Sequence, residues 1–142
     1  MKLRIMNISL KYKADEEYIA HNESGCTLPI DMLSADQKKA FSPTELLLAG
    51  VVACAAVDIV SMIKKRRKTF IDMDAAIIGE RKDDHPRGFK MIRMKYTIYS
   101  PDATDQEVER IVDLAVNKYC SVADSLNKEI ALTHEFEIKR QK

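Results

Sequence analysis

The sequence has few of the features that mark several common classes of protein. Its three cysteines, Cys26, Cys54 and Cys120, lie far apart. Their odd number and wide spacing fit neither a secreted disulfide framework nor paired zinc ligands. The net charge is only +1, so no overall field attracts nucleic acid or a membrane surface. Because a glycine-rich phosphate loop and a Ser/His/Asp array are also missing, we expect free thiols and neither a metal nor a cofactor.

Length and composition are those of a globular protein. The chain has 142 residues, of which 46% are hydrophobic and 32% charged. We therefore expect a single domain over residues 1–142. The first ten residues alternate charged and apolar side chains, unlike a signal peptide or a transit segment. This start and the free cysteines predict a cytoplasmic protein.

The expected elements describe an α+β protein. Residues 3–12 place Leu3, Ile5, Ile8, Leu10 and Tyr12 close to a period of two, which predicts a strand. The remaining predicted elements follow in chain order: strands over 18–21 and 26–30 that complete an antiparallel meander, a helix from 42 to about 66, a β-hairpin of 70–80 and 89–99, a helix from 104 to near 120, a short helix over 121–127, and a closing strand over 130–139.

The long central helix is apolar enough to raise the alternative of a membrane span. The stretch Leu46–Ile63 contains only Asp58 and Ser61 as clearly polar side chains. Asp58 near the middle of a span would cost about 2.5 to 3.5 kcal/mol, and the amphipathic strands on both sides need a helix to cover them. We therefore expect a core helix that is buried on all sides, between a sheet and either a second helix or a second subunit.

Cys54 lies on the only polar face of this helix. Gly50, Asp58 and Ser61 share that face with it at helical spacing. An inert core thiol is the simpler interpretation, since free cysteine is among the most buried residue types. A carboxylate such as Asp58 disfavours a thiolate, so a reactive Cys54 would need a cation nearby.

Two segments of the sequence resemble a known family. Residues 42–54, Ser-Pro-Thr-Glu-Leu-Leu-Leu-Ala-Gly-Val-Val-Ala-Cys, resemble the signature around the first cysteine of OsmC and Ohr proteins. Residues 120–126, Cys-Ser-Val-Ala-Asp-Ser-Leu, look like the segment around the second cysteine of that family. The order of elements agrees along nearly the whole chain, and residues 57–61 and 118–123 look most like the YhfA-like branch.

The resemblance implies a fold, an assembly and a chemistry. It implies an OsmC-like fold in an intertwined homodimer, in which the N-terminal meander over residues 1–40 is exchanged with the partner subunit. It also implies an oxidative-stress peroxidase that reduces organic hydroperoxides, with Cys54 as the peroxidatic cysteine and Cys120 as the resolving one. A dithiol reductant of the lipoyl type would then restore the two thiols.

The sequence departs from the family pattern at the groups that activate the first thiol. Family members carry a Glu ten residues before this cysteine, where the chain has Thr44, although Glu45 is adjacent. They also supply an Arg from an N-terminal loop, and no Arg lies between Leu10 and Ala40. Arg81, His85 and Arg87, in the charged loop of the hairpin, are the candidate substitutes, with Glu45 and Asp58 as supporting residues. A solvated loop is the simpler interpretation of the three substitutes.

Two functions from different classes therefore remain. The first is a hydroperoxide reductase that uses Cys54 and Cys120. The second is a non-enzymatic OsmC-like dimer that binds a hydrophobic small molecule, or acts as a redox sensor. The two differ in whether peroxide is turned over.

Overall fold

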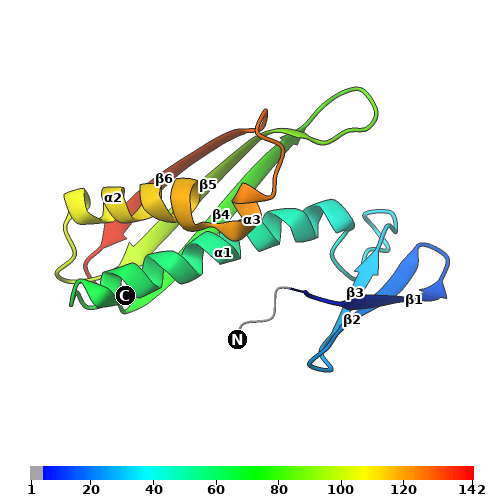
Figure 1. Ribbon diagram of the computed structural model, residues 1–142, viewed down its shortest axis with the longest axis horizontal. Coiled ribbons are helices and arrows are strands. Elements are labelled where there is room, and N and C mark those ends of the chain that lie inside the picture. Colours follow the sequence, from blue (N-terminus) through cyan, green and yellow to red (C-terminus); the bar gives the residue numbers. More distant parts are fainter. Residues whose placement is uncertain (1–4) are drawn as a thin grey trace. The chain divides into compact units, whose positions relative to one another are not determined.

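A computed structural model describes residues 5–142 and has an α+β architecture (Figure 1). Contacts divide the chain into two compact units, one that ends at Leu47 and one from Leu48 to Lys142. Each unit is described by itself below. The predictions of one domain over residues 1–142 and of an exchanged segment over 1–40 stay predictions.

The first unit contains the predicted antiparallel meander. It consists of β1 (Ile8–Ala14), β2 (Glu17–Asn22) and β3 (Thr27–Asp31), in the order β1-β2-β3. Gly25 has φ +85° in the turn between β2 and β3, a conformation that costs glycine little. The first strand begins at Ile8 and not at residue 3, and Leu3 lies outside the described residues.

The long helix α1 (Pro43–Lys65) begins where the sequence predicts. The Glu45 amide donates to the Ser42 hydroxyl at 3.3 Å, and the Ser42 amide donates to the Glu45 carboxylate at 3.0 Å. These two bonds form a capping box, which satisfies main-chain donors that have no partner inside the helix. At the other end, Lys64 and Lys65 place positive charge against the negative end of the helix dipole.

The second unit is a three-stranded sheet with its helices on one face (Figure 1). β4 (Asp72–Arg81) and β5 (Phe89–Tyr99) form the predicted hairpin, and β6 (Ala131–Lys139) pairs in parallel with the other edge of β5. Between β5 and β6 lie α2 (Asp105–Leu114), a π-helical turn η1 (Ala115–Tyr119) and the short helix α3 (Ser121–Asp124).

One stripe of α1 forms the centre of the core. Its members recur every four residues and are fully buried: Val51, Ala55, Ile59 and Ile63. They belong to a cluster with Met94, Tyr96 and Ile98 of β5 and Val108, Ile111 and Val112 of α2. The spacing keeps these side chains on one face of the helix. Among the described residues α1 alone has the length and apolar composition of a membrane span, and this stripe makes it the core helix of the second unit.

The single chain does not bury α1 on all sides. Val57 is 69% exposed, because the sheet and the neighbouring helices cover only part of the circumference of α1. Tyr119, which stands at helical spacing from the buried Val112 and Ala115, is also exposed, by 50%. It lies in the π-helical turn, whose wider winding changes the angular position of each residue relative to an α-helix.

Candidate thiol site

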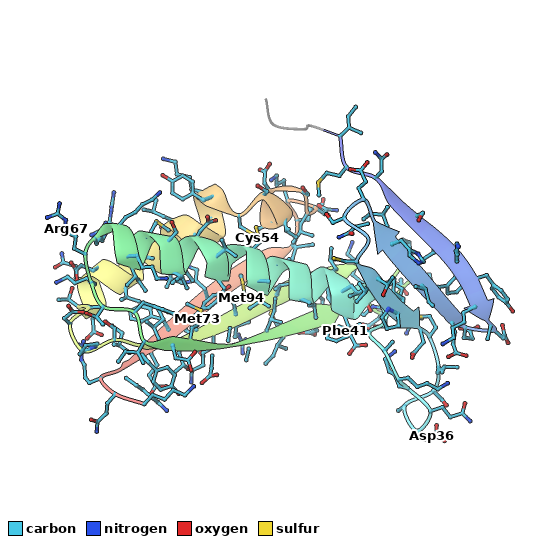
Figure 2. The ribbon with its side chains drawn as sticks, turned by 90° about the horizontal axis from the view of Figure 1, so that it is seen from below. Asp36, Phe41, Cys54, Arg67, Met73 and Met94 are labelled. Atoms are coloured by element: carbon cyan, nitrogen blue, oxygen red, sulfur yellow. The ribbon has the colours of Figure 1, made fainter. Side chains whose placement is uncertain are left out.

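The fold brings Cys54 and Cys120 together. Cys54 lies half-buried on α1, where Figure 2 labels it, and Cys120 lies between η1 and α3 with 3% of its surface exposed. Both are free thiols. The Cys54 side chain is close enough to raise the pKa of the Cys120 thiol, so the two cysteines are neighbours in the fold although they are far apart in the sequence.

The sulfur of Cys120 is held between two helices. The Ala123 amide donates to it at 3.3 Å, so Cys120 is the N-cap of α3. The thiol in turn points to the main-chain carbonyl of Val51 on α1, at 3.8 Å. These contacts fix the Cys120 side chain toward the turn of α1 that carries Cys54.

The π-helical turn directly before Cys120 was not predicted from the sequence. An uninterrupted α-helix to about residue 120 was expected, whereas α2 ends at Leu114 and η1 covers Ala115–Tyr119. Single π-helical turns occur often at functional sites. Here the turn sets the angle at which the chain arrives at Cys120.

Burial controls the ionisation of Cys120. Loss of hydration raises the pKa of the Cys120 thiol, and the adjacent Cys54 raises this pKa further. The main-chain amides of Ala123 and Val122 oppose the change, since hydrogen bonds from them favour a thiolate. The net direction is upward, so Cys120 is held as a neutral thiol at neutral pH.

Tyr96 is a site residue that our sequence analysis missed. It is fully buried on β5, and its hydroxyl donates to the main-chain carbonyl of Val52 at 3.0 Å and lies 3.5 Å from the sulfur of Met94. Figure 2 shows Met94 on the sheet beneath α1. Burial raises the pKa of Tyr96, and negative charge on Cys120 and Cys54 raises it further. The signal was available, because a tyrosine on the apolar phase of a strand needs a partner for its hydroxyl.

None of the predicted activating and supporting residues, His85 included, forms a hydrogen bond or an ion pair with either thiol in the described chain. Glu45 belongs to the first unit, where its carboxylate caps α1 and lies 3.7 Å from Lys38. Asp58 follows Cys54 by one turn of α1 and forms no ion pair within residues 5–142. Arg81 and Arg87 are exposed in and beside the β4–β5 loop, where the Arg81 guanidinium donates to the Arg87 carbonyl at 2.7 Å. The groups that shift the pKa of Cys120 include no cation.

A pocket of about 200 Å³ lies beside Cys120. Cys120 contributes to its wall, and Cys54 does not. The other lining residues come from η1, α3, the following loop and β6: Val116, Asn117, Lys118, Ala123, Asp124, Leu126, Asn127, Lys128, Ile130 and Leu132. In the part of the chain that the structure describes, no three His, Cys, Asp or Glu side chains are grouped as metal ligands would be.

Known proteins resemble the chain in sequence and in fold. The sequence model of the family described as OsmC-like protein matches residues 35–135. Protein YhfA of Escherichia coli (strain K12) is 34% identical over 133 residues, which cover 94% of this chain and 98% of YhfA.

Two solved structures extend the comparison to the fold. An OsmC-like protein from Mycoplasma pneumoniae superposes with a TM-score of 0.85 at 18% identity, over 96% of this chain and 99% of that one. The organic hydroperoxide resistance protein OhrB of Bacillus subtilis superposes with a TM-score of 0.61 at 14% identity, over 95% and 98% of the two chains.

Proposed function

The chain belongs to the OsmC-like family, and from that membership we propose that it is a thiol peroxidase that reduces organic hydroperoxides. Cys54 is the peroxidatic cysteine and Cys120 the resolving one. The observation that supports the proposal is the proximity of two free thiols, one on α1 and one at the start of α3, where Cys54 raises the pKa of Cys120. A peroxidase of this kind needs two thiols within bonding reach, so that a sulfenic acid is captured before it is oxidised further.

The proposed reaction has two steps. The Cys54 thiolate attacks the peroxide oxygen that carries the proton, the O–O bond breaks, and the alkoxide takes a proton to leave as an alcohol. Cys54 is then a sulfenic acid. The Cys120 sulfur attacks the Cys54 sulfur, the S–O bond breaks, and the hydroxyl group leaves as water with the proton of Cys120. The product is a Cys54–Cys120 disulfide, and the peroxide has gained two electrons.

Burial supports this division of roles. Cys54 is half-buried and so remains open to a substrate, whereas Cys120 is 3% exposed and has a raised pKa. A neutral Cys120 does not compete for peroxide, since the thiolate is the nucleophile. Its single S–H points to the Val51 carbonyl and would turn to donate to the Cys54 thiolate once that thiolate forms. This neutral donor serves in place of the arginine that the family pattern supplies.

The cycle requires a reductant and a compartment that provides it. We expect a dithiol of the lipoyl type to reduce the disulfide, and a reducing compartment such as the cytoplasm to keep the thiols free. A peroxidase that consumes organic hydroperoxides in this compartment would contribute to oxidative-stress defence.

Exposed apolar side chains in both units support a homodimer. On β1 of the first unit, Ile8, Leu10 and Tyr12 follow the period of two and are all exposed, Tyr12 by 67%. On α1 of the second unit, Val57 is exposed in the middle of the most apolar helix. Contiguous apolar surface of this kind is typical of a protein interface. A second copy of the chain that covers these residues is the assembly we propose.

Peptide mapping after a near-stoichiometric dose of an organic hydroperoxide tests the peroxidase. We expect a Cys54–Cys120 disulfide in the unmodified protein, no oxidation product at Cys120 in Cys54→Ser, and sulfinic acid at Cys54 in Cys120→Ser. Hydrogen peroxide serves as the comparison oxidant. If both thiols of the unmodified protein stay free, the peroxidase is excluded and the non-enzymatic ligand-binding or redox-sensing dimer becomes the better account.

A further inference from the structure

The pocket beside Cys120 has the size and the walls of a small-molecule site. Its volume is about 200 Å³, and an apolar cavity of about 150 Å³ is enough to hold a molecule the size of benzene. Four of its lining residues carry larger aliphatic side chains: Val116, Leu126, Ile130 and Leu132. These side chains fit a short hydrocarbon chain.

The charged groups in the wall do not repel an anion. Asp124 is the only carboxylate in the wall, and the Lys128 ammonium pairs with it at 3.2 Å. Lys118 also contributes to the wall, and its ammonium stands 5.5 Å from the centre of the Tyr119 ring. It has no carboxylate partner within residues 5–142. The rim therefore has a positive surplus, which favours the approach of a thiolate.

The pocket reaches one of the two sulfur-bearing residues only. Cys120 lines it and Cys54 does not. A thiolate that opens a disulfide attacks one sulfur and expels the other, and it must approach in line with the bond that breaks. A thiolate that attacks the Cys120 sulfur must approach it from the side opposite Cys54. A pocket that is lined by Cys120 but not by Cys54 can provide this approach.

Resting on the peroxidase function proposed above, we propose that this pocket is the reductant site, in which a small aliphatic dithiol attacks the Cys120 sulfur of the oxidised protein. One thiolate of the dithiol bonds to the Cys120 sulfur, the Cys54–Cys120 bond breaks, and Cys54 leaves as a thiolate. The second thiol of the reductant then attacks the reductant sulfur that is bonded to Cys120. A cyclic disulfide leaves, Cys120 takes a proton, and the dithiol has lost two electrons.

The chemistry of the leaving group supports the same choice of sulfur. A thiol with a lower pKa leaves faster in disulfide exchange. Burial raises the pKa of Cys120, so attack on Cys54 would have to expel the Cys120 thiolate into a site that disfavours its charge. Attack on Cys120 avoids this cost, because the charge develops on the half-buried Cys54.

A trapping experiment on the unmodified chain reads the attacked sulfur directly. The purified protein is oxidised with diamide, which makes the disulfide without any peroxide, and is pulsed briefly with 2-mercaptoethanol. Free thiols are then blocked with N-ethylmaleimide in acid, and the two peptides are mapped. We expect the mercaptoethanol adduct on Cys120 and the maleimide on Cys54. The reverse distribution overturns the proposal.

A pair of variants tests the pocket itself. Leu126→Trp fills the pocket, whereas Glu129→Trp adds the same bulk at an exposed position of the same loop outside the lining. We expect Leu126→Trp to slow reduction of the diamide-made disulfide by dithiothreitol by about tenfold or more, and Glu129→Trp to behave as the unmodified chain. Equal reduction rates in the three proteins would overturn the pocket assignment.

Failure of this proposal and failure of the peroxidase are distinguishable. If diamide makes the disulfide but a hydroperoxide does not, the peroxidase proposal is excluded. The trapping experiment and the reduction rates of the variants still test the reductant site in that case. If the adduct forms on Cys54 while hydroperoxide does give the disulfide, only the reductant site fails. If diamide itself cannot join Cys54 to Cys120, both proposals are excluded.

Discussion

The hydroxyl of Tyr96 donates a hydrogen bond to the main-chain carbonyl of Val52 at 3.0 Å, which ties β5 to the turn of α1 just before Cys54. The adjacent carbonyl, that of Val51, receives the Cys120 thiol at 3.8 Å. One turn of α1 therefore holds both the central strand and the second thiol. The geometry of the thiol pair depends on this turn.

Replacing Tyr96 by Phe removes the hydroxyl and keeps the ring. We expect the free energy of unfolding in urea to fall by about 1 kcal/mol, the usual net value of one hydrogen bond. Disulfide formation after a peroxide dose should also slow relative to over-oxidation of Cys54. Tyr99→Phe is the control, since the Tyr99 hydroxyl bonds to Asp74 at the surface at 3.1 Å. Equal effects of the two variants would show that the Val52 contact has no special role.

Alkaline pH should destabilise the protein through two buried acids. The folded-state pKa values of Cys120 and Tyr96 are both raised. An acid with a raised folded-state pKa contributes its full stabilisation below its unfolded-state pKa, which is about 8.5 for cysteine and 10 for tyrosine. The stabilisation is lost as pH rises from that value toward the folded-state pKa. We expect Tm to fall progressively above about pH 8.5. Cys120→Ser should flatten the first part of the fall, and an unchanged profile would contradict the assignment.

The π-helical turn before Cys120 can be tested by changing its length. Inserting one alanine after Lys118 should rotate the chain that follows by about 100°, the rotation of one α-helical residue. The Cys120 sulfur would then leave its place beside Val51. We expect Cys54 still to be oxidised by hydroperoxide but the disulfide to be lost, as peptide mapping would detect. The control Lys118→Ala keeps the length of the turn and should still form the disulfide. If Lys118→Ala also fails to form it, the Lys118 side chain matters and not the length of the turn.

Gly79 on β4 is packed too closely for a larger residue. A Cβ atom there would lie 2.5 Å from the Phe89 ring and 2.9 Å from a methyl carbon of Leu48. Overpacking of this kind costs about 1 to 3 kcal/mol, so we expect Gly79→Ala to unfold at a correspondingly lower urea concentration. A Cβ at Gly88 would meet no atom within 4 Å. Gly88→Ala should be close to neutral, and a similar loss at both glycines would refute the packing argument.

In the first unit, Asp31 should make stability sensitive to acid. Its buried carboxylate accepts hydrogen bonds from the Lys38 ammonium at 2.8 Å and the Lys39 amide at 2.9 Å. The Lys38 hydrogen bond lowers the pKa of Asp31 most, and burial opposes it. A lowered pKa contributes stability that is present above the unfolded value of about 3.9 and is lost as pH falls through the folded value.

Asp31→Asn tests this sign. The variant should be less stable than the unmodified protein at neutral pH, and the difference in Tm should shrink as pH falls below about 4. Asp36→Asn is the control, because Asp36 is exposed and bonds only to the hydroxyl of Ser34 among the described residues. A difference in Tm that does not change with pH would show that Asp31 acts by shape and not by charge.

The sequence by itself determined the features that depend on neighbours along the chain. Ser42 with Glu45 and Thr104 with Glu107 form capping boxes at the two helix starts that the sequence predicts. These hydrogen bonds join residues only three positions apart. The meander and the β4–β5 hairpin follow from alternating side chains and turn residues. The motifs that end in Cys54 and begin at Cys120 were enough to identify the family.

The tertiary structure alone decided what depends on distant residues. The contact between Cys54 and Cys120, the hydroxyl of Tyr96 on Val52, the parallel pairing of β6 with β5 and the exposed side of α1 all depend on how separate elements pack. No local sequence pattern predicts the direction in which the chain leaves η1 and enters Cys120. Local periodicity specifies which face of an element is apolar, but the partner of that face is selected by the packing of the whole unit.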